Sequence, residues 1–238
     1  MVEFMNFYIP PANPDPQDPP PTTIPWDKEQ AGAGYYQMLR GMKLDCNGNA
    51  GATGLYFNQA QDSSIEDVTI DATGAISGIR GLPARASVVV NVEIIGGQFG
   101  LDTNGTKNPG TVVVGAVLTN QTVNAVRHDG FVPLVLVGFR ISTPPGYRIP
   151  AVTLQPTPPT NSGAAQYSAE TSGVHLIDGI ITLGDEPDIA AIDNITNGRN
   201  FYARNVYVSG GNNTSKLVAS PSGLPTGSGV SKLIREYS

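Results

Sequence analysis

Apolar and polar residues repeat along this chain with a period of roughly one β-helix coil. Seven short segments each begin with a small or polar residue, followed by an apolar, a variable and an apolar position. Alternation with a period of two predicts strands, and a repeat of this length predicts a solenoid or another repeat architecture. The steps between first residues are 23 to 26 residues, except for one step of 41. The seven first residues are Gly41, Asp67, Asn91, Gly115, Gly138, Gly179 and Asn205.

Two further apolar stretches in each repeat complete the predicted coil. A second strand follows the first after a corner, as in residues 54–56 and 78–80, and a third apolar stretch precedes the next repeat, as in residues 87–90. We therefore predict an all-β fold: a right-handed, single-stranded parallel β-helix (solenoid) of about seven coils with three strands per coil. A leucine-rich repeat is the weaker alternative, because it requires Leu at fixed spacing and an Asn ladder in every unit.

The sequence divides into two regions. Residues 1–30 are expected to form an N-terminal strand and a Pro-rich extension, since Pro cannot donate the hydrogen bonds of a sheet. Residues 31–238 are expected to form the β-helix. The step of 41 implies a loop insertion around residues 143–171, a stretch that is rich in Pro, Gly, Ser and Thr.

Composition excludes some partners. The net charge is −6, and Lys and Arg are scattered along the chain, which argues against nucleic acid and against an anionic membrane surface. The single cysteine, Cys46, excludes an internal disulfide framework and a Cys-based zinc site. No apolar run is long enough to span a membrane, and the first residues do not have the pattern of a signal peptide.

Three stretches carry a family resemblance. Residues 34–45 (GYYQMLRGMKLD), 54–61 (GLYFNQAQ) and 64–70 (SIEDVTI) resemble the pectin-lyase-like superfamily, and a later coil ends in residues 96–100 (GGQFG). Within that superfamily they are most similar to the branch of exo-β-1,3-glucanases and related secreted carbohydrate-active proteins. The resemblance implies a parallel β-helix, a polysaccharide partner and an extracellular location. It covers roughly residues 34–142.

The resemblance also has a limit. Such proteins begin with a phrase like Asp-Phe-Gly-Ala-x-Gly-Asp-Gly-x-Thr-Asp-Asp before a capping helix, and this phrase is absent. The chain is therefore expected to be an interior fragment of a longer protein, with uncapped ends that favour end-to-end self-association or a second chain or domain. The resemblance places the catalytic acid of the glucanase branch on a second β-helix, so it transfers no catalytic residue to this chain.

The second strand of each coil provides the candidate substrate-binding residues. Its outward position after the apolar residue is occupied, coil by coil, by Tyr56, Arg80, Asp102, Arg127, Thr153 and Asp193. Stacked coils place these side chains in one column about 4.8 Å apart. An aromatic ring can stack on sugars, and Arg or Asp can bind hydroxyls or carboxylates. The alternative is a solvated ladder of ion pairs among Arg80, Asp102 and Arg127.

Two of these positions, Asp102 and Arg127, and the nearby Asp129 are the candidates for catalysis, whereas Tyr56, Arg80 and Asp193 are the candidates for substrate binding. Asp102 and Asp129 are expected about 8 Å apart, within the range for an inverting hydrolase. Asp129 also fits an ordinary turn residue. Arg127 is the candidate cation for a lyase, with His128 beside it, although strand alternation sends the two side chains to opposite faces.

The remaining chemistry is sparse. We expect no cofactor and no metal site, since residues 185–188, although acidic enough for a weak calcium site, fit an exposed turn better. Two functions remain open. One is a secreted polysaccharide hydrolase or lyase, or part of one, that binds a glycan along an outward groove. The other is a non-catalytic structural or adhesive β-helix module or an assembly fragment.

Overall fold

The computed structural model confirms a β-solenoid. It describes residues 2–3, 34–103, 110–128, 133–154, 173–184, 190–194, 200–210, 218–219 and 231–237. These residues form strands and the connections between them, and no helix occurs among them, so no described helix could cross a membrane. The described residues form about five turns, slightly fewer than the seven predicted.

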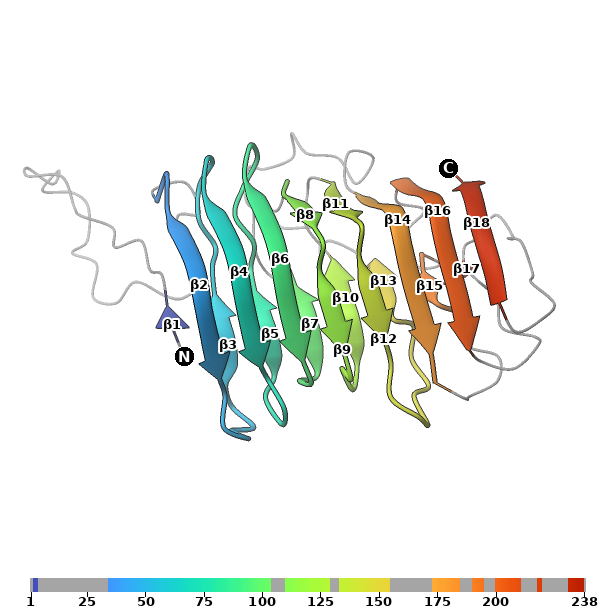
Figure 1. Ribbon diagram of the computed structural model, residues 1–238, viewed down its shortest axis with the longest axis horizontal. Helices are drawn as coiled ribbons and strands as arrows, with labels where there is room; N and C mark the ends of the chain where they lie inside the picture. The colour runs from blue at the N-terminus through green and yellow to red at the C-terminus, as the bar shows by residue number, and fades with distance from the viewer. Residues whose placement is uncertain are drawn as a thin grey trace, which may run out of the picture.

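Two sheets face each other across the core (Figure 1). We call them the long-strand sheet and the short-strand sheet. The long-strand sheet contains β2 (Met38–Asp45), β4 (Ser64–Asp71), β6 (Val88–Ile95), β8 (Val112–Val114), β9 (Val117–Thr119), β11 (Leu134–Val137), β12 (Arg140–Ser142), β14 (Gly173–Leu183), β16 (Asn200–Gly210) and β18 (Ser231–Tyr237). The short-strand sheet contains β1 (Val2–Glu3), β3 (Thr53–Tyr56), β5 (Ser77–Arg80), β7 (Phe99–Asp102), β10 (Asn124–His128), β13 (Val152–Leu154), β15 (Ile192–Asp193) and β17 (Val218–Ala219).

Three strands per coil are separate only in the middle of the molecule. There, β8 and β9, like β11 and β12, are separated by a corner at Gly115 or Gly138. In β2, β4, β6, β14 and β16, the predicted third strand of one repeat and the predicted first strand of the next form one continuous strand. This strand bends at the equivalent residue. All these strands pair in parallel with their neighbours, and each level of the stack is called a rung below.

The bend of each rung is made by a residue with a left-handed backbone. The first residues of the repeats have φ between 50° and 70° and lie in register, which explains why they are Gly, Asn or Asp. The prediction of Gly179 as the sixth first residue is wrong by one position, because Asp178 has the left-handed φ, of 53°. Asparagines bridge some of these corners: Asn91 donates to Asp67 (2.8 Å) and Asn205 donates to Asp178 (2.9 Å).

Gly179 instead belongs to the core. It lies in register between Phe139 and Val206, and a Cβ on Gly179 would collide with the Phe139 ring. Ala116 lies on the other side of Phe139 in the same inward column. The large ring is thus packed between two small residues, which keeps the volume of the column nearly constant.

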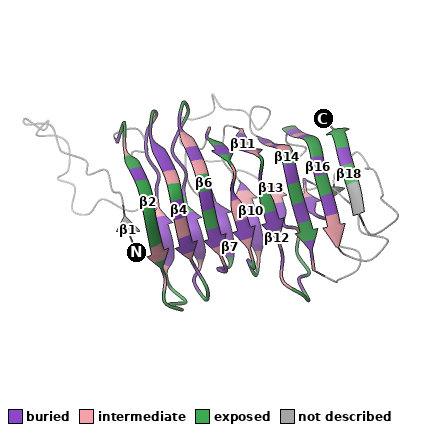
Figure 2. Ribbon diagram, viewed as in Figure 1, coloured by how far each residue is buried: buried purple, intermediate pink, exposed green. Residues whose placement is uncertain are grey.

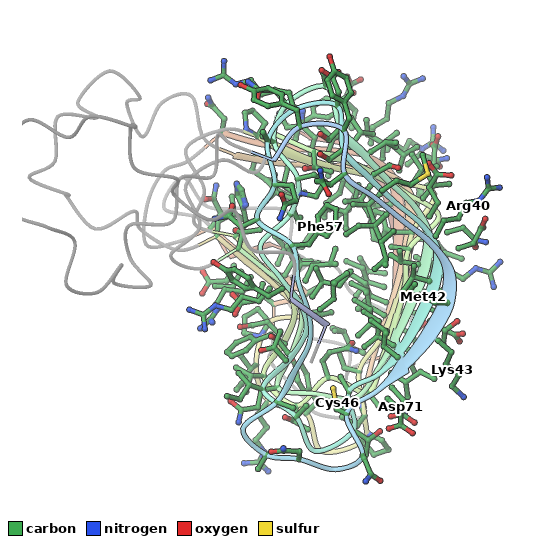
Figure 3. The ribbon with its side chains drawn as sticks, turned by 90° about the vertical axis from the view of Figure 1, so that its left-hand side faces the viewer. Arg40, Met42, Lys43, Cys46, Phe57 and Asp71 are labelled. Atoms are coloured by element: carbon green, nitrogen blue, oxygen red, sulfur yellow. The ribbon has the colours of Figure 1, made fainter. Side chains whose placement is uncertain are left out.

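The core is a stack of aliphatic columns between the two sheets. The inward residues of both sheets, such as Ile70, Ile94 and Leu101, are fully buried. Figure 2 shows the resulting alternation of buried and exposed positions along the long strands. In the end-on view of Figure 3, Phe57 points into the interior, whereas Arg40 and Lys43 point away from it. The alternation is therefore that of strands with one buried face.

A ladder of buried hydroxyls fixes one corner of the coil. Ser63 accepts a hydrogen bond from the Gln37 amide (3.1 Å), and Ser87 accepts one from the Ser63 amide (3.0 Å). Each hydroxyl also donates to a main-chain carbonyl of the preceding coil, and Thr111 does so to Pro83. These bonds satisfy main-chain groups that the corner would otherwise leave buried and unpaired.

The two ends of the stack differ. β1 pairs in parallel with β3, and β18 pairs antiparallel with β16. Among the described strands β2 pairs with β4 alone in its sheet, so none of these strands pairs with its outer edge, which is called the open edge of β2 below. The Pro-rich extension lies outside the described residues, as does most of the predicted insertion, whose described part ends in β13.

Candidate functional site

The six residues of the predicted column lie in register on the short-strand sheet. Tyr56 pairs with Arg80, Arg80 with Asp102, Asp102 with Arg127, Arg127 with Thr153, and Thr153 with Asp193. They therefore occupy the same position in six successive coils. We call this set the outward column. Five steps of about 4.8 Å give it a length of about 24 Å.

A break in alternation precedes this column. Gly54 and Gly78 point at the core, since a Cβ on them would collide with Ile70 and Ile94. The residues that follow, Leu55 and Ile79, are nevertheless fully buried as well. Two consecutive inward positions shift the phase of the strand, and the small residue makes room for this shift.

In β7 the same break places Phe99 on the outward side. Gly100 is the small residue of β7 at the position that Gly54 and Gly78 occupy in β3 and β5. The guanidinium carbon of Arg127 lies 3.6 Å from the centre of the Phe99 ring. This is a cation–π contact at short range. Phe99 was not predicted as a site residue. The GGQFG motif contains it, but regular alternation does not predict the phase of its side chain.

Asp102 and Arg127 form a bidentate ion pair. Arg127 donates from Nε to Oδ1 (2.8 Å) and from Nη2 to Oδ2 (2.7 Å). The Asp102 side chain is 2% exposed and that of Arg127 is 17% exposed. The predicted alternative of an ion-pair ladder therefore holds for this pair, but as a largely buried interaction and not as a solvated one.

This geometry limits what Asp102 can do. Both carboxylate oxygens accept charge-assisted hydrogen bonds from Arg127, so the group is engaged as an ion-pair partner and has little access to an incoming substrate. A general acid or nucleophile must reach the reacting atom. The arrangement therefore favours a positioning role for Asp102, which holds Arg127 flat against Phe99.

Arg80 presents a different kind of cation. Its side chain is exposed, and the described residues offer it no carboxylate within ion-pair distance, although Asp102 is its register partner. Asp102 is instead engaged by Arg127. An exposed guanidinium next to the half-buried Tyr56 can bind a carboxylate or a pair of hydroxyls on a ligand.

The side-chain amide of Asn124 holds the part of the column around Thr153 in place. Asn124 donates to the Thr153 hydroxyl (2.9 Å) and to the carbonyl of Pro150 (2.7 Å). Asn124 is itself buried and pairs with Phe99 in register. This residue was also missed by sequence reasoning, because its outward placement depends on the same break in alternation. Asp193, at the next rung, is half-buried.

His128 does not join this surface. It is fully buried, and its Nδ1 lies 3.0 Å from the Thr103 hydroxyl, which is buried as well. Arg127 and His128 thus point to opposite faces, as alternation predicts. Asp129 lies outside the described residues, so its distance to Asp102 stays a prediction.

Metal ligands and reactive groups do not gather elsewhere in the described chain. No group of three or more potential ligands occurs there, and residues 185–188 lie outside it. Burial lowers the pKa of His175, whose ring packs edge-on against Tyr202. Burial also raises the pKa of the Cys46 thiol, which lies at a corner of the first coil (Figure 3).

Comparison with known proteins does not extend this picture. No protein-family model matches the chain, and no curated protein or solved structure matches it either. The structure establishes a parallel β-solenoid. The resemblance to the pectin-lyase-like superfamily rests on the sequence motifs alone.

Proposed function

We propose that this chain is a carbohydrate-active β-helix protein that binds a polysaccharide along the outward column of the short-strand sheet. The observation that carries the proposal is the register of the column: an aromatic ring, an exposed guanidinium, a carboxylate and the guanidinium that this carboxylate holds occur at four successive rungs. Such a row offers repeated contacts to a repeating ligand. The proposal implies an extracellular location, where polysaccharides are found.

Each part of the column has a distinct role in this proposal. Tyr56 stacks on a sugar ring, and Arg80 binds a carboxylate or neighbouring hydroxyls. Arg127 uses Nε and Nη2 for Asp102, which leaves Nη1 for a ligand oxygen. Because Asp102 and Phe99 already fix this guanidinium, binding costs little side-chain entropy. Asp193 accepts hydroxyl hydrogen bonds at the far end.

Cleavage of the polysaccharide is the finer part of the proposal. A hydrolase needs two carboxylates that can reach the bond, and a lyase needs a base beside a cation. Asp129 is the candidate acid or base at the end of β10, and Arg127 is the candidate cation. Asp102 contributes by holding Arg127 in place.

A non-catalytic structural or adhesive module, or an assembly fragment, is the second candidate function. The burial of Asp102 in its ion pair favours it, because that pair removes one of the two predicted carboxylates from the surface. The open edge of β2, with which no other described strand pairs, also favours it. Such an edge can accept a strand from another chain or domain, as the predicted end-to-end association requires.

A binding panel separates these functions. Laminarin, pectin, polygalacturonate and alginate are titrated against the wild-type protein and the Arg80→Ala and Tyr56→Ala variants by isothermal calorimetry. Losing a hydrogen bond to a charged group costs about 1.5–3 kcal/mol, so Arg80→Ala should weaken binding of a recognised glycan about tenfold or more. The matched control is Arg140→Ala, an exposed arginine on the long-strand sheet, which should leave affinity unchanged.

Cleavage is measured on the same glycans through reducing ends and unsaturated-uronate absorbance. Activity that Asp129→Asn abolishes while binding persists would establish a catalytic column. Binding without cleavage would establish the non-catalytic module. The glycan-binding proposal would be contradicted if the protein bound no glycan of the panel, or if Arg80→Ala and Arg140→Ala lowered the affinity equally.

A further inference from the structure

The outer face of the long-strand sheet carries an apolar block on its central rungs. The outward positions of β6 before its bend, and those of β8 and β11, are all valine. The rungs pair in register, so the side chains form a grid of three rungs by two positions. Two of them, Val112 and Val114, are 38% and 37% exposed. We call this grid the valine face: Val88, Val90, Val112, Val114, Val135 and Val137.

A solvent-facing sheet would be expected to carry polar residues at these positions. The end rungs of the same sheet do so, with Arg40 and Glu66 near one end and Arg204 near the other. The apolar surface even extends past the grid, through Ile177 to the exposed Ile180. A contiguous exposed apolar patch with a charged rim is typical of a protein interaction site.

We propose that the valine face binds the valine face of a second copy of this chain, related by a two-fold axis that lies between the two facing sheets and runs parallel to their strands. The reason for choosing a second copy is the order of residues along one outward column. Read rung by rung it is acidic, four times apolar, then basic: Glu66, Val90, Val114, Val137, Ile177 and Arg204.

A two-fold axis between Val114 and Val137 makes this column complementary to itself. It places Val114 of one copy against Val137 of the other, and Val90 against Ile177. At both ends, it places Glu66 against Arg204. A closed two-fold dimer has one self-complementary patch on each copy, and this column meets that requirement in charge as well as in polarity.

The outer surface of the long-strand sheet, with the valine face at its centre, is large enough for a stable dimer. The six rungs from β4 to β16, about 4.8 Å apart, and the eight residue positions of β4 or β6, about 3.3 Å apart, span about 29 Å by 26 Å, or about 750 Å². A standard interface buries about 800 Å² on each partner. In the end-on view, Arg40 and Lys43 of β2 point away from the molecule on this side (Figure 3).

Sedimentation velocity over a concentration series tests the proposal. One chain has a mass of 24.9 kDa, and the wild-type protein should sediment as two chains at tens of micromolar. Val114→Lys should give a single chain, since it buries a charge in the centre of the interface. The matched control is Gln98→Lys, which adds the same charge at an exposed corner between β6 and β7 and should leave the dimer intact.

A charge exchange tests the two-fold geometry itself. Glu66→Arg and Arg204→Glu should each raise the dimer dissociation constant about tenfold or more, because each places like charges across the interface. The double variant exchanges the two charges and should restore dimerisation. The milder Val114→Thr keeps the shape of the side chain and should also weaken the dimer, in case Val114→Lys fails to fold.

Two outcomes would overturn the proposal. One is a single-chain mass for the wild-type protein at every concentration up to about 100 μM, a range in which a standard-size interface should associate. The other is a two-chain mass that persists in folded Val114→Lys, which would place the association elsewhere, such as the open edge of β2.

Discussion

The Asp102–Arg127 pair determines the chemistry of the outward column. Removing two charges from water is costly, and the cost is offset here by two short hydrogen bonds and by the contact of the guanidinium with Phe99. A pair of this kind contributes more to orientation than to net stability. Its consequence is a guanidinium that faces the column in one fixed orientation before any ligand arrives.

Breaking the pair should be more costly than its net contribution suggests. Asp102→Asn leaves a mostly buried guanidinium without its counter-charge, and we expect a loss of about 3 kcal/mol, at the lower end for buried pairs because Arg127 keeps some solvent contact. Urea unfolding followed by circular dichroism measures it. Glu93→Gln, an exposed carboxylate on the other sheet, should change stability by less than about 0.5 kcal/mol. Equal effects of the two substitutions would show that the pair is not buried in solution.

The position of these residues along the column was predictable, but their contacts were not. The repeat aligns Arg80, Asp102 and Arg127 because each follows the inward residue of its strand. The partner of Asp102 cannot be chosen from sequence, since Arg80 and Arg127 are both one rung away. The contact between Arg127 and the Phe99 ring favours Arg127 as the partner of Asp102. The outward placement of Phe99 requires the break in alternation at Gly100.

The strands of the long-strand sheet depend on the left-handed residue at each bend. Gly138 isolates this effect, because its φ is 64° and a Cβ there would meet no atom within 4 Å. Gly138→Ala should therefore cost only the left-handed strain, about 1–2 kcal/mol. Gly138→Asn should cost less, because Asn tolerates this conformation. Thermal unfolding of both variants provides the comparison, and an Asn variant less stable than the Ala variant would contradict the role of the bend.

The column of Phe139 tests packing between rungs. Gly179→Ala pushes a methyl group into the Phe139 ring, and overpacking of this kind costs about 1–3 kcal/mol. Phe139→Leu alone leaves a cavity and should also destabilise the protein. In the double variant the smaller side chain makes room for the methyl group. The double variant should therefore lose less unfolding free energy than the sum of the losses in the two single variants. Additive losses in a double-mutant cycle of unfolding free energies would exclude a direct contact.

These elements show why the pattern predicts the architecture better than its details. Period-two alternation and a repeat near 24 residues are properties of every coil, so an error in one coil leaves the fold class unchanged. The sixth repeat shows the limit: Gly179 looks like a bend residue because it is Gly, yet it is small to accommodate Phe139. Residue type alone does not distinguish the two reasons, whereas the backbone of Asp178 does.

The solenoid as a whole separates its two proposed interactions by sheet. The short-strand sheet carries the outward column, and the long-strand sheet carries the valine face, with the aliphatic core between them. Each rung contacts only its neighbours, so stability is approximately a sum of coil and neighbour terms. A substitution in one surface should therefore leave the other unaffected.

Nearest-neighbour stacking predicts that one whole coil can be removed. Deleting residues 67–90 takes out 24 residues and joins Glu66 to Asn91, so the left-handed bend and the strand phase are kept. Thr111 then replaces Ser87 as the hydroxyl that accepts from the Ser63 amide, and Ile65 stacks on Val113 in place of Val89. The shortened chain should unfold cooperatively in urea, with an m-value about a tenth lower, since m scales with the surface exposed on unfolding.

The matched control for this deletion is longer by one residue. Removing residues 67–91 joins Glu66 to Val92, which loses the left-handed bend residue and shifts the residues that follow by one position relative to the neighbouring rungs. This variant should be less stable in urea than the 24-residue deletion, because the rungs on both sides bend at a position that it lacks. If both deletions behaved alike, the coils would not be interchangeable units. If the 24-residue deletion is the more stable of the two, the repeat read from the apolar pattern is the physical unit from which the molecule is built.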